Sequence, residues 1–225
     1  MMNMVMLSIL SVILTLGTWL YLLYIGNGKD EETKVTWKES FKSRKAVHIY
    51  AAVMAVVLLS TVAVLCSVYK TNTIIWNVKM ITILACIFCV AYVDYREYII
   101  PNKVILAGII IRMMIWLFEF IVSPNTFFII FKGDVIAAVI IVVFFLVCSF
   151  VIKEGIGMGD VKLMGLMALY HGLAGILSSI FFSMIAAFVG ALFLLITHKK
   201  TKKDSIPFAP AILVGSVLAV VMTGL

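Results

Sequence analysis

The sequence predicts an all-helical, polytopic bundle that crosses a membrane about eight times. Hydrophobic residues make up 64% of the 225 positions and charged residues 13%, a balance far outside that of soluble domains. The apolar segments are long enough to span a bilayer as helices, and they lack the alternating pattern that a membrane barrel requires. The net charge of +7 comes mainly from short loops, which is typical of membrane orientation signals rather than of nucleic-acid binding.

Three spans are expected in the first 93 residues, and the charge of their loops indicates their orientation. The segment between residues 26 and 46 holds six basic residues, so we expect it on the cytoplasmic side. Apolar residues begin the chain and the first basic residue is Lys29, which favours an uncleaved span over a secretory signal peptide. The expected spans are Met4–Ile25, Val47–Val68 and Ile74–Val93, with Tyr69–Thr73 on the outer side.

Five more helices are expected in the rest of the chain. The stretch Val161–Thr197 is too long for one ordinary span, and the loops on both sides of it are expected in the cytoplasm. An even number of crossings is then required, so we place a division near His171 and Gly172 and expect the first piece to be short or re-entrant. The expected helices are Val104–Val122, Val135–Ile152, Val161–Tyr170, Leu173–Thr197 and Ile206–Leu225, with Ser123–Asn125 and Lys132–Asp134 on the outer side.

Two aspartates mark the cytoplasmic ends of expected helices. Asp94 follows the third span, and Asp160 ends the glycine-rich segment Gly155–Asp160 directly before an apolar run. Two crossings separate these residues, so both carboxylates are expected on the same side of the membrane at similar depth. Two carboxyl groups within hydrogen-bonding distance share a proton, which lets one accept a proton from water while the other donates to a substrate carbonyl.

Each aspartate also has a simpler explanation. Asp94 fits a solvated loop residue paired with Arg96 or Lys103, and Asp160 fits a helix cap. The glycines before Asp160 allow positive φ and close approach of the backbone to a ligand. The same-side location together with this glycine loop favours a catalytic pair.

Three ordered segments resemble the motifs of the type IV prepilin peptidases, which are GxGD aspartyl proteases. Asp94–Asn102 resembles the family's aspartate followed by Ile-Pro-Asn, Gly157–Leu163 resembles Gly-x-Gly-Asp-x-Lys-Leu, and Ile206–Pro210 resembles the closing Ile-Pro-Phe-Gly-Pro. Ala209 stands where the family has glycine. The resemblance covers residues 74–225, which we interpret as the protease core, with residues 1–73 as a two-span extension.

The resemblance implies a membrane aspartyl endopeptidase that removes the short basic leader of prepilin-like substrates at the cytoplasmic face of the plasma membrane, without a metal or cofactor. It implies Asp94 and Asp160 as the catalytic pair and Gly157 and Gly159 as residues that let the loop bend. Lys162 would hold a substrate carbonyl or tune the pair, although an interfacial lysine explains it equally well. Candidates for substrate contact or core packing are Pro101, Asn102, Pro207, Phe208 and Pro210.

The resemblance also indicates a short form of the enzyme. The larger bacterial members carry a cytoplasmic domain with paired C-x-x-C motifs after the first span, linked to N-methylation of the new terminus. Here that place holds the 21 residues 26–46, which contain no cysteine and are too few to bury a core. We therefore expect peptidase activity without methyltransferase activity.

Arg112 and Glu119 are charged residues inside an expected span. They are seven positions apart and share a helix face, so we expect a structural ion pair, or side chains that snorkel to opposite interfaces, in preference to substrate binding. A small transporter that moves protons or cations is the alternative function, and it predicts charges lined along a membrane path. The four cysteines lie in apolar runs and are interpreted as core residues rather than metal ligands.

Overall fold

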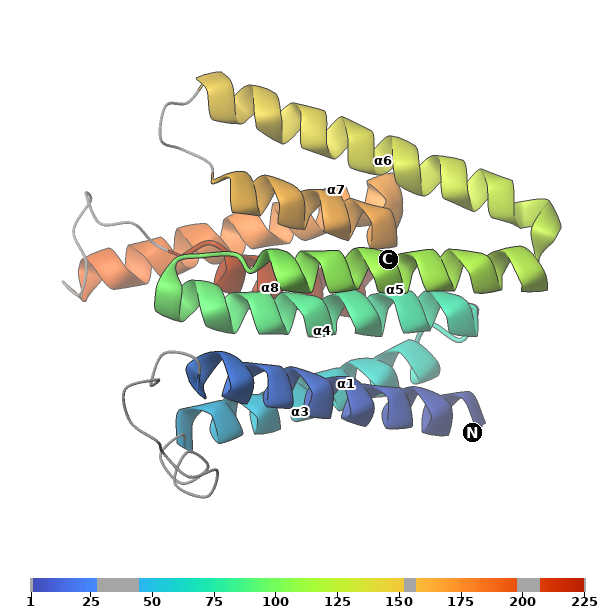
Figure 1. Cartoon of the computed structure of the whole chain (residues 1–225), viewed down its shortest axis with the longest axis horizontal. Helices are drawn as coiled ribbons and strands as arrows, with labels where there is room; N and C mark the ends of the chain where they lie inside the picture. Colours follow the sequence, from blue (N-terminus) through green and yellow to red (C-terminus); the bar gives the residue numbers. More distant parts are fainter. Residues whose placement is uncertain (1, 28–44, 152–156, 198–206, 225) are drawn as a thin grey trace.

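The chain forms a bundle of helices that run mostly lengthwise in Figure 1. The structure, a computed structural model, describes residues 2–27, 45–151, 157–197 and 207–224. These ranges contain helices and no strand, and six of the described helices are long and apolar enough to cross a membrane. The predicted polytopic helical bundle is therefore confirmed. The helices are α1 (Met2–Asn27), α3 (Lys45–Ser67), α4 (Ile74–Glu97), α5 (Asn102–Val122), α6 (Pro124–Val151), α7 (Met158–Ile196) and α8 (Ala209–Thr223).

Some positions named in the sequence analysis lie outside the described residues. They are most of the basic loop 26–46, the start of the glycine-rich segment with Gly155 and Ile156, and Ile206 of the third motif.

The expected sixth and seventh helices form one element, α7, so seven helices are described instead of about eight. Gly172 interrupts α7 with the non-helical angles φ 64° and ψ −174°, in a region of positive φ that favours glycine. In Figure 1 the first segment of α7 runs from Met158 toward the right, and the second segment returns toward the left. The break falls where the parity of crossings required a division.

The expected outer loop around Lys132 was wrong. Ser123 alone separates α5 from α6, and Pro124 occupies the first helical position, where its missing N–H costs no hydrogen bond. Residues 132–134 continue the helix, and Asp134 is buried. A Lys-Gly-Asp segment is typical of a loop, but here Asp134 pairs with Arg112 inside the bundle, which removes the need for solvent.

The core is organised around α4, the most buried of the described spans. In Figure 1, α1 and α3 lie on one side of α4, and α5 lies on the other. One cluster of buried residues joins α4 to the helices that follow it, and a second joins α4 to α1 and α3. The end of α4 that carries Asp94 is therefore held by neighbours on both sides.

The short helix α8 is held at its C-terminal end by three side chains from the α3–α4 corner. Trp76 Nε1 and Asn72 Nδ2 donate to the Gly224 carbonyl at 2.9 and 3.0 Å, and the Tyr69 hydroxyl donates to the Val221 carbonyl at 3.0 Å. The final carbonyls of a helix lack partners within it, so these donors satisfy them. The start of α8 is thereby directed toward the opposite end of the bundle.

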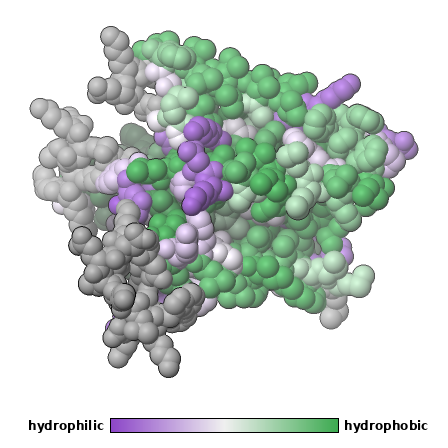
Figure 2. Space-filling model, in the orientation of Figure 1, coloured by the Kyte–Doolittle hydropathy of each residue, from purple (hydrophilic) through white to green (hydrophobic). Residues whose placement is uncertain are grey.

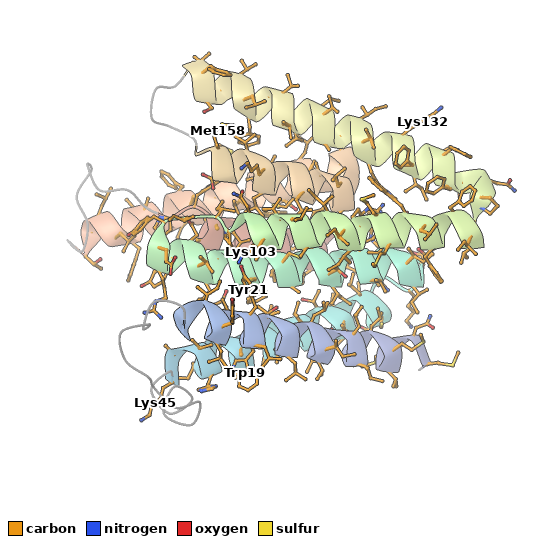
Figure 3. The ribbon with its side chains drawn as sticks, in the orientation of Figure 1. Trp19, Tyr21, Lys45, Lys103, Lys132 and Met158 are labelled. Atoms are coloured by element: carbon orange, nitrogen blue, oxygen red, sulfur yellow. The ribbon has the colours of Figure 1, made fainter. Side chains whose placement is uncertain are left out.

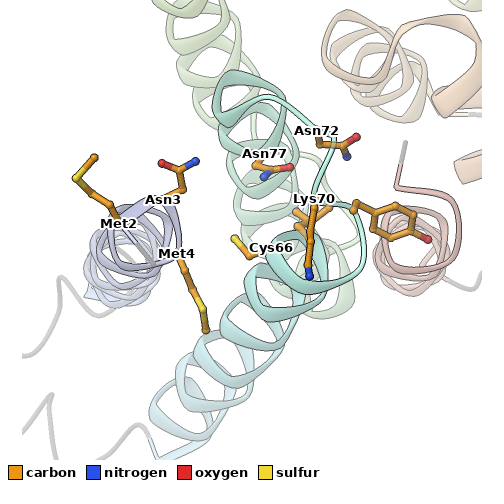
Figure 4. Close-up of a pocket in the computed structure, with 9 residues that line it drawn as sticks. Met2, Asn3, Met4, Cys66, Lys70, Asn72 and Asn77 are labelled. Atoms are coloured by element: carbon orange, nitrogen blue, oxygen red, sulfur yellow. The ribbon is translucent and has the colours of Figure 1, made fainter.

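A cavity of about 450 Å³ opens near the α3–α4 corner, between the start of α1, the end of α3 and the start of α4 (Figure 4). Lys70, Asn72 and Asn77 supply polar groups to its lining. A helix rises ~1.5 Å per residue, so Asn77 and Asp94 lie about 25 Å apart along α4. This cavity is therefore separate from the site of the carboxylates.

Candidate active site

Asp94 and Asp160 lie at the same end of the bundle, as the two intervening crossings predict. Asp94 is in the last turn of α4 and Asp160 is in the first turn of α7, and both helix ends face the left of Figure 1. Between them, α5 carries the chain away from this end and α6 brings it back. The two carboxyl groups are close enough to repel each other electrostatically. The fold thus brings together two acidic groups from distant parts of the sequence.

Asp94 belongs to α4 rather than to the loop after it, and it is only 7% exposed. Its Oδ2 atom accepts a hydrogen bond from the Ala209 N–H at 3.0 Å, and the carboxylate also accepts one from the Phe208 N–H. These donors stand at the start of α8, where free N–H groups and the helix dipole favour a negative partner. Arg96, one partner expected for a solvated Asp94, donates instead to the Tyr92 hydroxyl. The simpler explanation of Asp94 as a solvated loop residue is therefore wrong.

Asp160 lies in the first turn of α7, where its carboxylate caps the helix as its simpler explanation expects, and it is also within electrostatic range of Asp94. Its carboxylate accepts a hydrogen bond from the Gly157 N–H, so an acidic side chain in the first turn reaches back to the N-cap residue. A Cβ on Gly157 would lie 3.2 Å from Asp160 Oδ2. The glycine therefore leaves room for the carboxylate directly beside the backbone.

Gly159 permits close contact with the α4–α5 connection. A Cβ on Gly159 would lie 3.0 Å from Ile100 Cβ, closer than side chains normally approach. Gly157 has φ −70°, and Gly159 is absent from the described residues with positive φ. Positive φ, one of the two properties that glycine allows, is therefore not used at these two positions, and what they provide is space for close approach. Because Gly159 has no Cβ, the Gly-x-Gly-Asp loop can lie against the Ile-Pro-Asn segment.

Lys162 connects the first two motifs. Its Nζ donates a hydrogen bond to Asn102 Oδ1 at 3.0 Å, and both side chains are exposed. Hydrophilic residues interrupt the hydrophobic surface in this part of the molecule (Figure 2). Figure 3 labels two residues close in sequence to the site, Lys103 and Met158, and both lie toward the site end of the bundle. Lys162 is therefore an exposed residue at the edge of the site, and it binds Asn102, a residue of the first motif.

The proline residues of the motifs stand at helix starts. Pro101 is the N-cap of α5, and Pro210 lies in the first turn of α8, where the fixed φ of proline suits a helix start. Phe208 is the N-cap of α8 and packs against the main hydrophobic cluster. Pro207 is half-buried directly before it. These residues position α5 and α8, and through the Phe208 and Ala209 N–H groups they position Asp94.

The family model for the type IV leader peptidase family matches residues 81–195, which is half of the chain and includes both aspartates. The chain belongs to the type IV leader peptidase family. A prepilin leader peptidase/N-methyltransferase from Bacillus subtilis (strain 168) is 38% identical over 77 residues, which make up 34% of this chain and 31% of that protein. No solved structure matches the chain significantly.

In this member of the leader peptidase family, the expected ion pair between Arg112 and Glu119 is confirmed at 3.3 Å, but it is part of a larger cluster. Arg112 also pairs with Asp134, and Lys79 Nζ lies 3.9 Å from Asp134 Oδ2. Sequence reasoning missed both Lys79 and Asp134 as members of this cluster, and it placed Asp134 on the outer side of the membrane. A fully buried arginine with several donors was the available signal that more than one acceptor would be needed.

The buried charges of this leader peptidase family member do not line a path through the bundle. Lys79, Arg112, Glu119 and Asp134 balance one another in one cluster, which lies away from the two site aspartates. The transporter hypothesis predicted charges lined along a membrane path, and this single cluster does not favour it. Within the described ranges, no group of three or more potential ligand residues could hold a metal ion.

Proposed function

We propose that this chain is an aspartic endopeptidase that removes the short basic leader of prepilin-like substrates at the cytoplasmic face of the membrane. The observation that carries the proposal is the meeting of Asp94 and Asp160 at one end of the bundle, close enough to repel each other. Membership of the leader peptidase family supports peptide-bond hydrolysis as the reaction. The substrate class follows from the family resemblance and from the related protein in Bacillus subtilis.

The chemistry proposed for the pair needs one proton shared between two carboxyl groups. Because like charges at short range disfavour double ionisation, one carboxyl is protonated while the other is charged. The charged group takes a proton from a water molecule, and the protonated group donates to the carbonyl oxygen of the scissile peptide bond. The water oxygen attacks the carbonyl carbon as these protons move and gives a tetrahedral intermediate. The carboxyl group that took the water proton then passes it to the amide nitrogen, while the other carboxylate accepts a proton from a hydroxyl of the intermediate. The C–N bond breaks, which releases the leader and the free amine of the mature chain and restores the starting protonation of the pair.

The surroundings of each aspartate support these roles. The Phe208 and Ala209 N–H groups hold Asp94 in a fixed orientation, and the Gly157 N–H holds Asp160. Fixed carboxylates reduce the reorganisation that hydrolysis requires. We propose that Lys162 sits at the rim, where it binds Asn102 and lies within reach of a substrate backbone.

The proposed orientation places the site in the cytoplasm. Basic residues near membrane ends favour the cytoplasmic side. Among the described residues near membrane ends, more basic side chains stand at the site end than at the opposite end. Those at the site end are Lys45, Arg96, Lys103 and Lys162, and those at the opposite end are Lys70 and Lys132.

The test is cleavage of a prepilin by the purified protein in detergent, with the products identified by mass spectrometry. We expect Asp94→Asn and Asp160→Asn each to abolish cleavage, because either change removes the shared proton arrangement. Glu97→Gln, one turn after Asp94 on the same helix, is the matched control and is expected to keep the wild-type kcat. Wild-type cleavage by either aspartate variant would contradict the mechanism. The mature product is expected to carry no added methyl group.

A further inference from the structure

Four charged side chains from three helices meet inside the bundle, away from the proposed catalytic pair. Arg112 of α5 pairs with Asp134 of α6 and with Glu119 of its own helix, and Lys79 of α4 approaches Asp134. All four residues are nearly or fully buried. Trp116 Nε1 also donates to Asp134 Oδ2 at 3.2 Å.

This cluster is not explained by stability alone. Its two positive and two negative groups balance, yet burying paired charges rarely gains stability over hydrophobic residues of similar size. Charged residues within membrane spans are rare for the same reason and usually have a specific role. The position of the cluster in the fold indicates what that role is.

The cluster lies against the break in α7. Arg112 Nε donates to the Leu169 carbonyl at 2.9 Å, three residues before Gly172. Asp134 is the nearest group to Gly172, since a Cβ there would lie 3.8 Å from Asp134 Oδ1. The carbonyl end of a helix segment carries partial negative charge, and an arginine that binds its last carbonyls stabilises it. Arg112 therefore caps the first segment of α7.

Arg112 also donates one of three hydrogen bonds that align α5 with this segment of α7, and it is the furthest of the three from the site end of α5. At the site end, Lys162 donates to Asn102, and further along the Tyr170 hydroxyl donates to the Gly108 carbonyl at 2.7 Å. Each bond joins residues 57 to 62 positions apart, so the two helices run in parallel side by side. Gly108 permits the close approach, because a Cβ there would lie 2.7 Å from Leu166 Cδ2.

We propose that Arg112 is a positioning residue: through Leu169 it fixes the first segment of α7 lengthwise against α5 and so sets the height of Asp160 relative to Asp94. Leu169 and Asp160 lie on one rigid helical segment, about 14 Å apart at ~1.5 Å per residue. Movement at the capped end is therefore transmitted to the carboxylate. The link to catalysis rests on the proposed function, whereas the effect on helix register does not.

The register is measured by cross-linking without substrate. In a variant lacking the four native cysteines, Asn102→Cys and Lys162→Cys place two thiols at contacting, exposed positions, and a short bis-maleimide joins them in native membranes. This pair removes one of the three aligning bonds, so the cross-link depends on the remaining two. Activity is measured separately in the chain that keeps Asn102 and Lys162.

Three variants separate positioning from charge balance. Arg112→Gln with Glu119→Gln keeps the buried cluster neutral, since Lys79 and Asp134 remain as a pair. Arg112→Lys keeps the charge, but an ammonium group cannot bind both carboxylates and the carbonyl as the guanidinium does. Lys132→Gln removes an exposed positive charge from α6 and is the matched control.

We expect both Arg112 variants to lower the cross-linking yield about threefold or more, and the Lys132 variant to leave it unchanged. In the activity assay we expect kcat to fall on the order of tenfold to a hundredfold with little change in KM, because small displacements of a catalytic group reduce the rate and not the binding.

Folded variants with wild-type cross-linking would show that the cluster only balances charge and would overturn the proposal. Failure of both Arg112 variants to fold would also overturn it, since the cluster would then be needed to assemble the bundle. A wild-type protein that cleaves no prepilin but shows the expected cross-linking change would count against the proposed function alone.

Discussion

The space at Gly159 provides the sharpest test of how the two motifs meet. A Cβ at this position would lie 3.0 Å from Ile100 Cβ, and 3.3 and 3.4 Å from Ile100 Cγ1 and Cδ1. Carbon atoms prefer separations of about 3.5 to 4.0 Å, so Gly159→Ala forces the loop away from Ile100 by roughly 0.5 to 1 Å. Asp160 is the next residue and must move with the loop.

A displacement of this size is large for catalysis and modest for folding. A misplacement of about 1 Å costs up to a hundredfold in rate, so we expect Gly159→Ala to lower kcat on the order of tenfold to a hundredfold. Overpacking of this kind destabilises by about 1 to 3 kcal/mol at most, so the variant is expected to remain folded. The assay is initial-rate cleavage of a prepilin in detergent, with folding checked by circular dichroism.

Two further variants make this prediction specific. Gly190→Ala adds the same methyl group to the same helix, but nothing lies within 4 Å of its Cβ, so we expect an unchanged kcat. Ile100→Gly combined with Gly159→Ala removes the Cβ, Cγ1 and Cδ1 contacts and is expected to restore part of the rate. A folded Gly159→Ala variant with kcat within about twofold of wild type would refute the argument that this glycine provides space the site needs.

Two further predictions concern contacts away from the aspartates. Gly215→Ala places a Cβ against the backbone of Ser183, where α7 and α8 are in direct contact. We therefore expect the free energy of unfolding, measured by thermal unfolding, to fall by about 2 kcal/mol or more. Gly133→Ala is the control and should leave it unchanged, because nothing lies within 4 Å of a Cβ at that position. Lys162→Met and Asn102→Ala each break the same hydrogen bond. In a double-mutant cycle on kcat we therefore expect a coupling energy of about 0.5 to 1.5 kcal/mol between the two residues. Fully additive effects would show that the bond has no part in the reaction.

The positions of Asp94 and Asp160 at one end could be predicted from the sequence because membrane crossing is counted from local hydropathy. Each apolar stretch of sufficient length reverses the side of the chain, so parity alone places both residues together. The break at Gly172 followed from the same count, since a single crossing would have put the two flanking loops on opposite sides.

The contacts around the site could not be obtained in this way. The Phe208 and Ala209 N–H groups bind Asp94 only because α8 packs beside α4, a pairing that no local pattern encodes. The glycine at position 159 matters through its distance to Ile100, and this distance depends on how two loops pack. From the sequence, close approach and positive φ were both possible reasons for this glycine, and no local pattern identified Ile100 as the residue it contacts.

Asp134 shows the same limit at the other end of the bundle. As a local signal, Lys-Gly-Asp favours a loop, because a lone carboxylate in a membrane helix is costly. Arg112 compensates that cost from another helix, so the segment stays helical and buried. The pairing of charges between helices is a long-range property and was therefore decided by the tertiary structure.

By itself, the sequence determined the helical class, the approximate spans and the location of the two aspartates at the same end of the bundle, because these depend on hydropathy and on counting along the chain. Tertiary packing alone decided which backbone groups bind Asp94, which residue lies against Gly159, and which side chains pair with Arg112. The physical reason is that transfer into a membrane acts on each segment separately, whereas hydrogen bonds and close contacts require two segments at a defined distance.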